Sequence, residues 1–262
     1  MTNDKKMTPE QKQEITELRD RNLTPKQIAR KLGLRAAEVT AYIKEQAEEK
    51  TLARAASGEL DPVVECFVNA NCADYYLHEN PDPIEETEAN IDRGLALVCI
   101  TRKAKYDRFT VCTYLLDVWC LGVKDTMGPR QLNSVEYKQM LDYAYQGFPE
   151  GPQKITLEQA QALVYSAVDY AEQLGFKPHQ DFQQSRFHLG KWSGQPKIQM
   201  GRNGKPFYIS GPYDNPETII NILRKNVGEG NFDYMTQLFD DSDESGSFTD
   251  SLLTETLLKE LL

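Results

Sequence analysis

The 262-residue sequence lacks an apolar run of about 18 residues, so no membrane-spanning helix is expected. Its first residues, 1–13, also lack the apolar core of a secretory signal peptide. Cysteines are few, odd in number and without the regular spacing of a disulfide framework. These absences predict a cytoplasmic protein with reduced thiols.

The motifs of several common enzyme classes are missing as well. The sequence contains no glycine-rich GxGxxG or GxxxxGK[ST] loop and no HExxH or GxSxG motif. Cys66, Cys72 and His78 are spaced more widely than the ligand pairs of structural zinc sites. The sequence therefore predicts no resident metal or cofactor and does not by itself indicate an enzyme.

Charge is distributed unevenly along the chain, whose net charge is −10. Residues 1–55 hold 12 basic and 9 acidic side chains, a net charge of +3, and the remainder carries −13. An acidic body repels phosphate, so any contact with nucleic acid is expected at the N-terminal end. The alternative is that the negative charge only keeps the protein soluble.

Two helix starts near the N-terminus share one pattern, Thr-Pro-x-Gln, beginning at Thr8 and at Thr24. Threonine caps the helix, proline fits its first turn, and glutamine can bond back to the cap. A tight turn at Gly33 and a third helix near Arg35 follow. The pattern predicts a compact head of three helices.

Residues Leu23–Gln46 resemble the helix-turn-helix superfamily in their two helices, short glycine turn and small residue Ala29. The resemblance implies that the third helix enters the major groove of DNA. The expected nucleic-acid-binding residues are Lys26, Arg30, Lys31, Arg35, Thr40, Tyr42 and Lys44. Because these cations are few, one copy should bind DNA weakly. A homodimer would bind more tightly, since its second head would contact a second half-site. The alternative is a head that docks another protein.

Four regions are expected along the chain: a helix-turn-helix domain at 1–50, a linker at 51–60, an α+β domain at 61–238 and an acidic tail at 239–262. The tail is Ser- and Asp-rich and predicted to be disordered. It ends in an amphipathic helix, 251–262, that could dock on its own domain, a second copy or another protein.

The central region is predicted to mix two β-hairpins with helices, which favours the α+β class. The first hairpin pairs Leu95–Thr101 with Phe109–Trp119, although the second run could also be a buried helix. The second pairs Lys197–Met200 with Pro206–Ser210 around an Asn-Gly turn. Helices are expected over Ser134–Gly147, Thr156–Gly175 and Asn215–Gly228.

Several acidic side chains in this region are catalytic candidates. Asp117 interrupts an apolar run, so it must find a partner or face a cleft. With Asp125 and with Asp169, Glu172 or Asp181 it could bind Mg²⁺ in a nuclease that cleaves phosphodiesters. The alternatives are a solvated Asp117 or an ion pair with a neighbour such as Lys124.

Two further candidates come from loops. His179 could act as a general base oriented by Asp181, and His188 is a candidate of the same kind. A ligand site is also conceivable around two predicted turns, where basic groups stand beside aromatic rings that can stack on a base. Its residues are Arg202, Lys205, Tyr208 and Tyr213. An ordinary solvated hairpin would give the same pattern.

Three central segments resemble a widespread bacterial family without an established activity: Tyr114–Arg130, Ala162–Phe182 and Met200–Asn215. The resemblance supports one central domain and implies no reaction, cofactor or partner. The sequence thus favours a DNA-binding protein with a regulatory or targeting role. A metal-dependent nuclease and a docking component of a larger assembly are the alternatives.

Overall fold

The computed structural model describes residues 7–21, 23–77, 94–103 and 106–236. The chain divides into two compact units, Met1–Ser57 and Gly58–Leu262, which we call the head and the body. The predicted acidic tail with its terminal helix lies outside the described residues, and so does the acidic segment 79–93.

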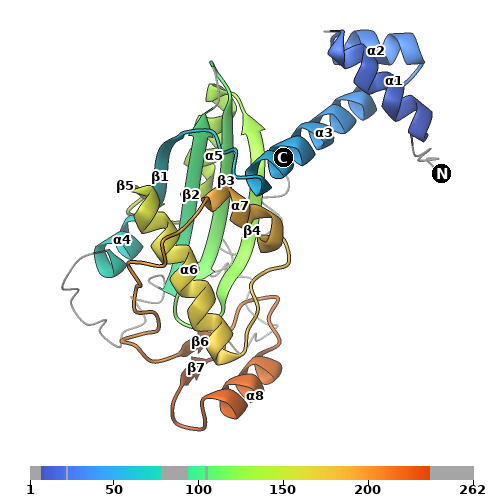
Figure 1. Ribbon diagram of the computed structural model, residues 1–262. Helices are drawn as coiled ribbons and strands as arrows, with labels where there is room; N and C mark the ends of the chain where they lie inside the picture. Colours follow the sequence, from blue (N-terminus) through green and yellow to red (C-terminus); the bar gives the residue numbers. More distant parts are fainter. Residues whose placement is uncertain (1–6, 22, 78–93, 104–105, 237–262) are drawn as a thin grey trace. The chain divides into compact units, whose positions relative to one another are not determined.

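The head consists of the three predicted helices, α1 (Pro9–Asp20), α2 (Pro25–Leu32) and α3 (Ala36–Ala56) (Figure 1). Both Thr-Pro-x-Gln starts are confirmed, because each threonine accepts the backbone N–H of its glutamine, which bonds back to the cap. A small apolar core joins the helices. Its buried residues are Ile15, Leu18, Ile28, Ala29, Val39 and Tyr42.

A left-handed glycine makes the turn between α2 and α3. Gly33 has φ of +66°, a conformation that costs other residues energy, and its N–H donates to the Ala29 carbonyl. The third helix extends through Ala56, so residues 51–56, expected in a linker, are helical. Alanine, leucine and arginine in this stretch favour the helix.

The body is built on one antiparallel sheet with strand order β4-β3-β2-β1-β5. The strands are β1 (Val63–Asn69), β2 (Leu95–Lys103), β3 (Phe109–Asp117), β4 (Gly122–Leu132) and β5 (Pro152–Ile155). The first predicted hairpin is confirmed, since β2 and β3 pair from Leu95↔Asp117 to Lys103↔Phe109.

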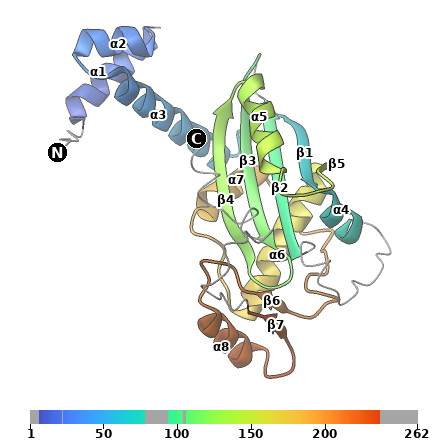
Figure 2. The ribbon, with the colours of Figure 1, turned by 180° about the vertical axis from the view of Figure 1, so that it is seen from behind.

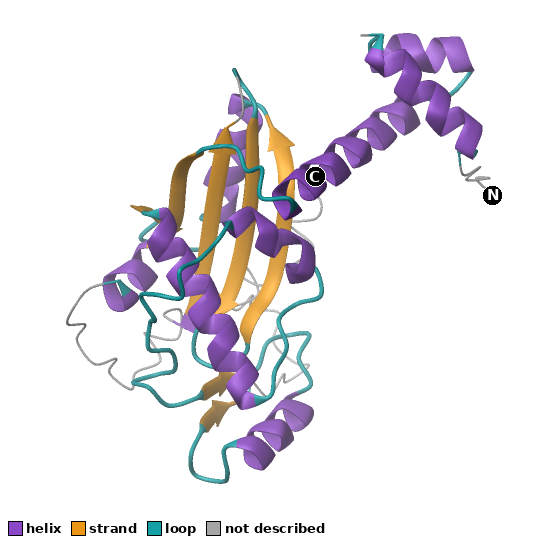
Figure 3. Cartoon of the chain, in the orientation of Figure 1, coloured by secondary structure: helices purple, strands orange, loops and turns teal. Residues whose placement is uncertain are grey.

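Helices cover both faces of this sheet (Figures 1 and 2). On one face lies α6 (Leu157–Leu174), whose buried side chains join the largest apolar core, and on the other lies α5 (Ser134–Ala144). Two short helices complete the layers, α4 (Ala70–Tyr76) and α7 (Phe182–Leu189). Figure 3 shows this α+β organisation. Among the described helices none combines the length and apolar character needed to cross a membrane.

The second predicted hairpin is not formed as expected. The turn exists, with a bridge between Arg202 and Lys205, but Lys197–Met200 is not a strand. Instead β6 (Phe207–Ile209) pairs in parallel with β7 (Asp233–Met235), and α8 (Pro216–Asn226) connects the two. The asparagine-glycine pair fixes only the local turn, while a segment far along the chain provides the strand partner.

Candidate functional site

Three of the exposed cations of the head lie on α2. Lys26, Arg30 and Lys31 are all exposed, and Lys26 and Arg30 share one side of the helix because they are four residues apart. Lys44, farther along α3, is exposed as well. These four side chains can reach solvent anions, as phosphate contacts require.

Arg35 and Glu38 form an ion pair at the start of α3. The Arg35 Nε donates to Glu38 Oε1 at 2.9 Å, a terminal guanidinium nitrogen donates to the same oxygen, and the Arg35 backbone N–H donates to Oε2 at 3.3 Å. The hydrogen bond from Arg35 holds the pKa of Glu38 below its ordinary value. Arg35 is therefore exposed, but the negative charge of Glu38 offsets its positive charge.

Thr40 and Tyr42 differ in accessibility, although both were expected on the outward face. Thr40 is exposed and its Oγ1 donates to the Ala36 carbonyl at 2.8 Å. Tyr42 is buried in the head core, so its prediction as an outward contact was wrong. The reason is helical spacing: Tyr42 follows the fully buried Val39 by three residues and shares its inward side.

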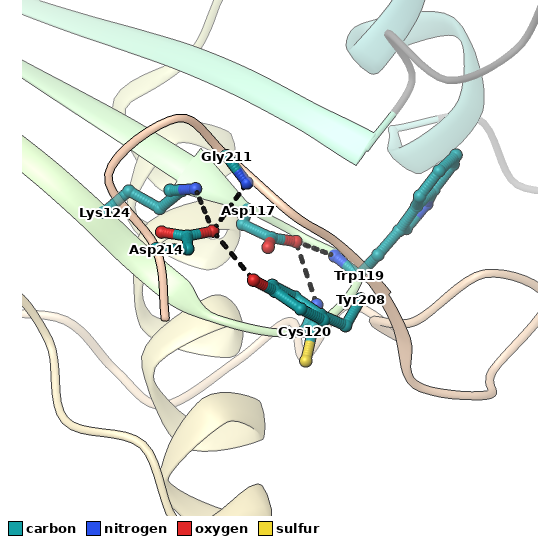
Figure 4. Close-up of polar contacts among 7 residues, drawn as sticks. All are labelled: Asp117, Trp119, Cys120, Lys124, Tyr208, Gly211 and Asp214. Atoms are coloured by element: carbon teal, nitrogen blue, oxygen red, sulfur yellow. Dashed lines mark hydrogen bonds and ion pairs between the residues drawn. The ribbon is translucent and has the colours of Figure 1, made fainter. Parts of the chain in front are cut away.

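In the body, Asp117 ends β3 and is buried (Figure 4). Its Oδ1 accepts the backbone N–H groups of Trp119, at 3.0 Å, and Cys120, at 2.9 Å. Burial raises the pKa of Asp117, while the Lys124 charge and the backbone N–H bonds act in the opposite direction. Asp117 thus shapes the turn between β3 and β4.

A second carboxylate, Asp214, lies close to this turn and accepts three hydrogen bonds (Figure 4). Its Oδ2 receives the Gly211 N–H at 2.8 Å, the Tyr208 hydroxyl at 3.3 Å and the Lys124 ammonium at 3.4 Å. A Cβ on Gly211 would lie 3.2 Å from both charged atoms of this ion pair. The cluster joins β4 to the loop after β6.

His179 lies between two of the predicted carboxylates. Its Nδ1 is 3.8 Å from Asp125 Oδ1 and 3.8 Å from Asp181 Oδ2, and its backbone N–H donates to the Val123 carbonyl on β4. Asp169, however, pairs with Lys197 at 3.4 Å. The expected carboxylate cluster is therefore divided: Asp125 and Asp181 lie at the histidine, Asp169 pairs with Lys197, and Glu172 is exposed.

Within the described ranges no group of three or more His, Cys, Asp or Glu side chains is arranged to hold a metal ion. Asp117 is committed to a turn, and its convergence with Asp125 and Asp169 or Asp181 was the geometric condition of the nuclease hypothesis. No such grouping is found among these described residues, and the nuclease alternative stays a prediction.

The residues of the predicted ligand site do not form one surface. Tyr208 is fully buried and bonded to Asp214, whereas Tyr213 is exposed. Lys205 pairs with Asp233, and the Arg202 guanidinium lies over the Phe207 ring at 4.7 Å from its centroid. Tyr208, Lys205 and Arg202 therefore make separate contacts that hold the segment, and Tyr213 faces solvent.

Sequence reasoning missed a polar connection between β2 and α7. Arg102 is buried and donates to the carbonyls of Asp61, His188 and Leu189. His188 is also buried, with Nε2 3.1 Å from the Ile100 carbonyl, and burial together with Arg102 lowers its pKa to about 3. The signal was an arginine directly after the apolar run Leu95–Thr101. A neutral, enclosed His188 is a packing residue in this geometry.

Comparison with models of known protein families, with curated proteins and with solved structures finds no match. The geometry of the chain itself is therefore the basis for a functional proposal.

Proposed function

We propose that this protein binds double-stranded DNA through its head and acts as a regulatory or targeting factor. The observation that carries the proposal is the α2–Gly33–α3 arrangement together with exposed cations on α2 and on the outward side of α3. In this arrangement the third helix can lie in the major groove while the second faces the backbone. Lys26, Arg30 and Lys31 would then contact phosphates.

The electrostatics support weak binding by one copy. Arg35 is compensated by Glu38, so the phosphate attraction depends on Lys26, Arg30, Lys31 and Lys44. Each phosphate that a cation neutralises contributes to affinity through release of counterions. We therefore expect two copies to engage one duplex together, because a second head doubles the number of these contacts.

A cytoplasmic location fits the same proposal. All five cysteines are free and buried, as expected for thiols kept reduced inside the cell. Burial raises the pKa of Cys66 to about 11, so its thiol stays protonated and unreactive at neutral pH.

The test is fluorescence anisotropy of a labelled duplex of about 24 base pairs, long enough for two half-sites. The full chain is compared with a Lys26→Ala, Arg30→Ala, Lys31→Ala variant between ~50 and ~200 mM salt. Losing three phosphate contacts per head, six in a complex of two copies, should weaken binding and flatten the plot of log affinity against log salt by up to about 5.4, or ~0.9 per contact.

The matched control removes three exposed lysines from the body, Lys177→Ala, Lys191→Ala and Lys225→Ala. It changes net charge equally and should leave affinity and salt dependence near those of the unaltered chain. Equal losses in both variants would mean that the head has no special role. No binding by the unaltered chain at low salt would contradict the proposal outright.

A further inference from the structure

One end of the body's sheet, where β2 and β3 are joined, carries exposed apolar side chains. Tyr106 in the connection is 90% exposed, Val135 at the start of α5 is 64% exposed, and Val64 on β1 is 42% exposed. The Ser134 N–H donates to Asp107 Oδ1 at 3.0 Å, which holds the start of α5 beside the connection. Strand β1 begins opposite the last residues of β2, so all three apolar side chains lie at this end.

Three cations lie at the same end of the sheet. Lys103 ends β2, Arg108 comes directly before β3, and Lys138 lies early in α5. None of the three forms an ion pair within the part of the chain that the structure describes. The acids nearest to them in the sequence, Asp107 and Glu136, each accept a backbone N–H at the start of α5.

The three apolar side chains and the three cations together form a surface that we call the hairpin end: Val64, Lys103, Tyr106, Arg108, Val135 and Lys138. Exposed apolar groups bordered by polar ones are typical of a protein docking site. Because its charges are positive, the hairpin end suits a partner that is both apolar and acidic.

The last residues of the same chain have this character in their sequence. Residues 237–262, which lie outside the described residues, hold seven acidic side chains and one lysine. Within them, 251–262 has the apolar period of an amphipathic helix, whose leucines are Leu252, Leu253, Leu257, Leu258, Leu261 and Leu262. Such a helix binds by laying its apolar face on an apolar surface, with its charges at the border.

The length of the chain allows this segment to reach the hairpin end of its own body. Strand β7 precedes the segment and lies beyond the opposite end of the sheet, where the Phe207 N–H donates to the Trp119 carbonyl (Figures 1 and 2). The 14 residues 237–250 can extend over about 46–50 Å. The nine residues of β2 span only about 30 Å. A short tether also gives a high effective concentration, so a weak contact within one chain is populated.

We propose that residues 251–262 dock on the hairpin end of their own body. Their leucines would cover Tyr106 and Val135, and the acids of 240–260 would lie beside the three cations. Tyr234 and Met235 of β7 are exposed as well, but Lys205 beside them already pairs with Asp233 at 2.9 Å. The inference concerns the body alone, so it stands or falls independently of DNA binding by the head.

The experiment places a nitroxide on the full chain at Ser251→Cys and records amide NMR spectra of the isotope-labelled protein. The five native cysteines are buried, so the added thiol is the reactive one. Compared with the reduced label, the nitroxide should remove most of the amide intensity at 106–109 and 134–138. No loss there, or loss confined to β7 and α8, would overturn the inference.

A mixed sample identifies which copy provides the segment. Nitroxide-labelled chains without isotope are combined with isotope-labelled chains without nitroxide. The inference predicts that the intensity at 106–109 and 134–138 is then retained. Loss of the same intensity in the mixture would mean that the segment docks on a second copy, which would overturn docking within one chain.

Two variants of the nitroxide-labelled chain test the surface itself. Lys103→Ala, Arg108→Ala, Lys138→Ala removes the three cations, and Tyr106→Ala removes an exposed ring without touching the core. Each should restore most of the lost intensity. The control Lys177→Ala, Lys191→Ala, Lys225→Ala changes charge equally and should restore none. Unchanged losses in both test variants would show that the hairpin end is not the docking site.

Discussion

Asp117 shows how a single polar residue can be tolerated in an apolar strand. Its carboxylate receives two backbone N–H groups at the β3–β4 turn, and Lys124 lies near enough for its charge to be favourable. Buried polar groups with such partners are ordinary parts of a fold. Neither predicted alternative holds in full: Asp117 is not solvated, and Lys124 forms its ion pair with Asp214.

His188 offers a sharper test at the same scale, because its pKa differs greatly between folded and unfolded chains. The folded value is about 3, and the ordinary value is 6.5. The unfolded chain therefore binds more protons at acidic pH, so stability is fully present above about 6.5 and is lost as pH falls toward about 3.

We predict that replacing this histidine by His188→Gln weakens the pH dependence of stability. Between pH 7 and 5 the unaltered chain should lose about 2 kcal/mol of unfolding free energy from this group, an upper estimate, and the variant should not. Glutamine can still donate to the Ile100 carbonyl. The comparison is of the change between the two pH values, so a lower stability of the variant at pH 7 does not affect it. The measurement is denaturant unfolding at both pH values, and parallel losses would show that His188 is not the group responsible.

Among the elements, α6 is the clearest case in which sequence signals specify a boundary. Thr156 caps it, Gly175 ends it with φ of +96°, and Asn226 of α8 donates to the Leu174 carbonyl at 2.9 Å. A Cβ on Gly175 would lie 2.0 Å from Asn226 Nδ2. The glycine thus serves both the helix end and the contact between the two helices.

Gly175→Ala should destabilise the body by about 2–3 kcal/mol, combining a strained left-handed residue with displacement of Asn226. Gly151→Ala is the matched control, since Gly151 also has positive φ, +69°, but its Cβ would meet nothing within 4 Å. That variant should lose only about 1 kcal/mol. Thermal or denaturant unfolding compares them, and equal losses would mean that the α6–α8 contact contributes nothing.

Helices whose ends are marked by capping residues could be predicted from the sequence. Strands that form only by pairing with a segment elsewhere in the chain could not. Capping residues correctly placed the starts of α1, α2, α6 and α8. Strand β4 was missed because GVKDTMGPRQL is polar and contains a proline, and it is a strand through pairing with β3. The same limit applies to the sites: Arg35 and Glu38 are three residues apart, whereas Lys124 and Asp214 are 90 apart.

For the whole molecule, the division of charge follows the division into head and body, and the positively charged part is the N-terminal head. The head has its own apolar core. Its residues 1–55 have a net charge of +3, whereas the rest of the chain has a net charge of −13. Binding of nucleic acid by the head is the central proposal.

The most direct test is to record backbone amide NMR shifts of the isotope-labelled full chain during titration with a mixed-sequence duplex at low salt. The account predicts shifts concentrated in α2, the Gly33 turn and the first turns of α3, with the sheet and helices of the body little changed. Shifts concentrated in the body, or no shifts anywhere at saturating duplex, would contradict it.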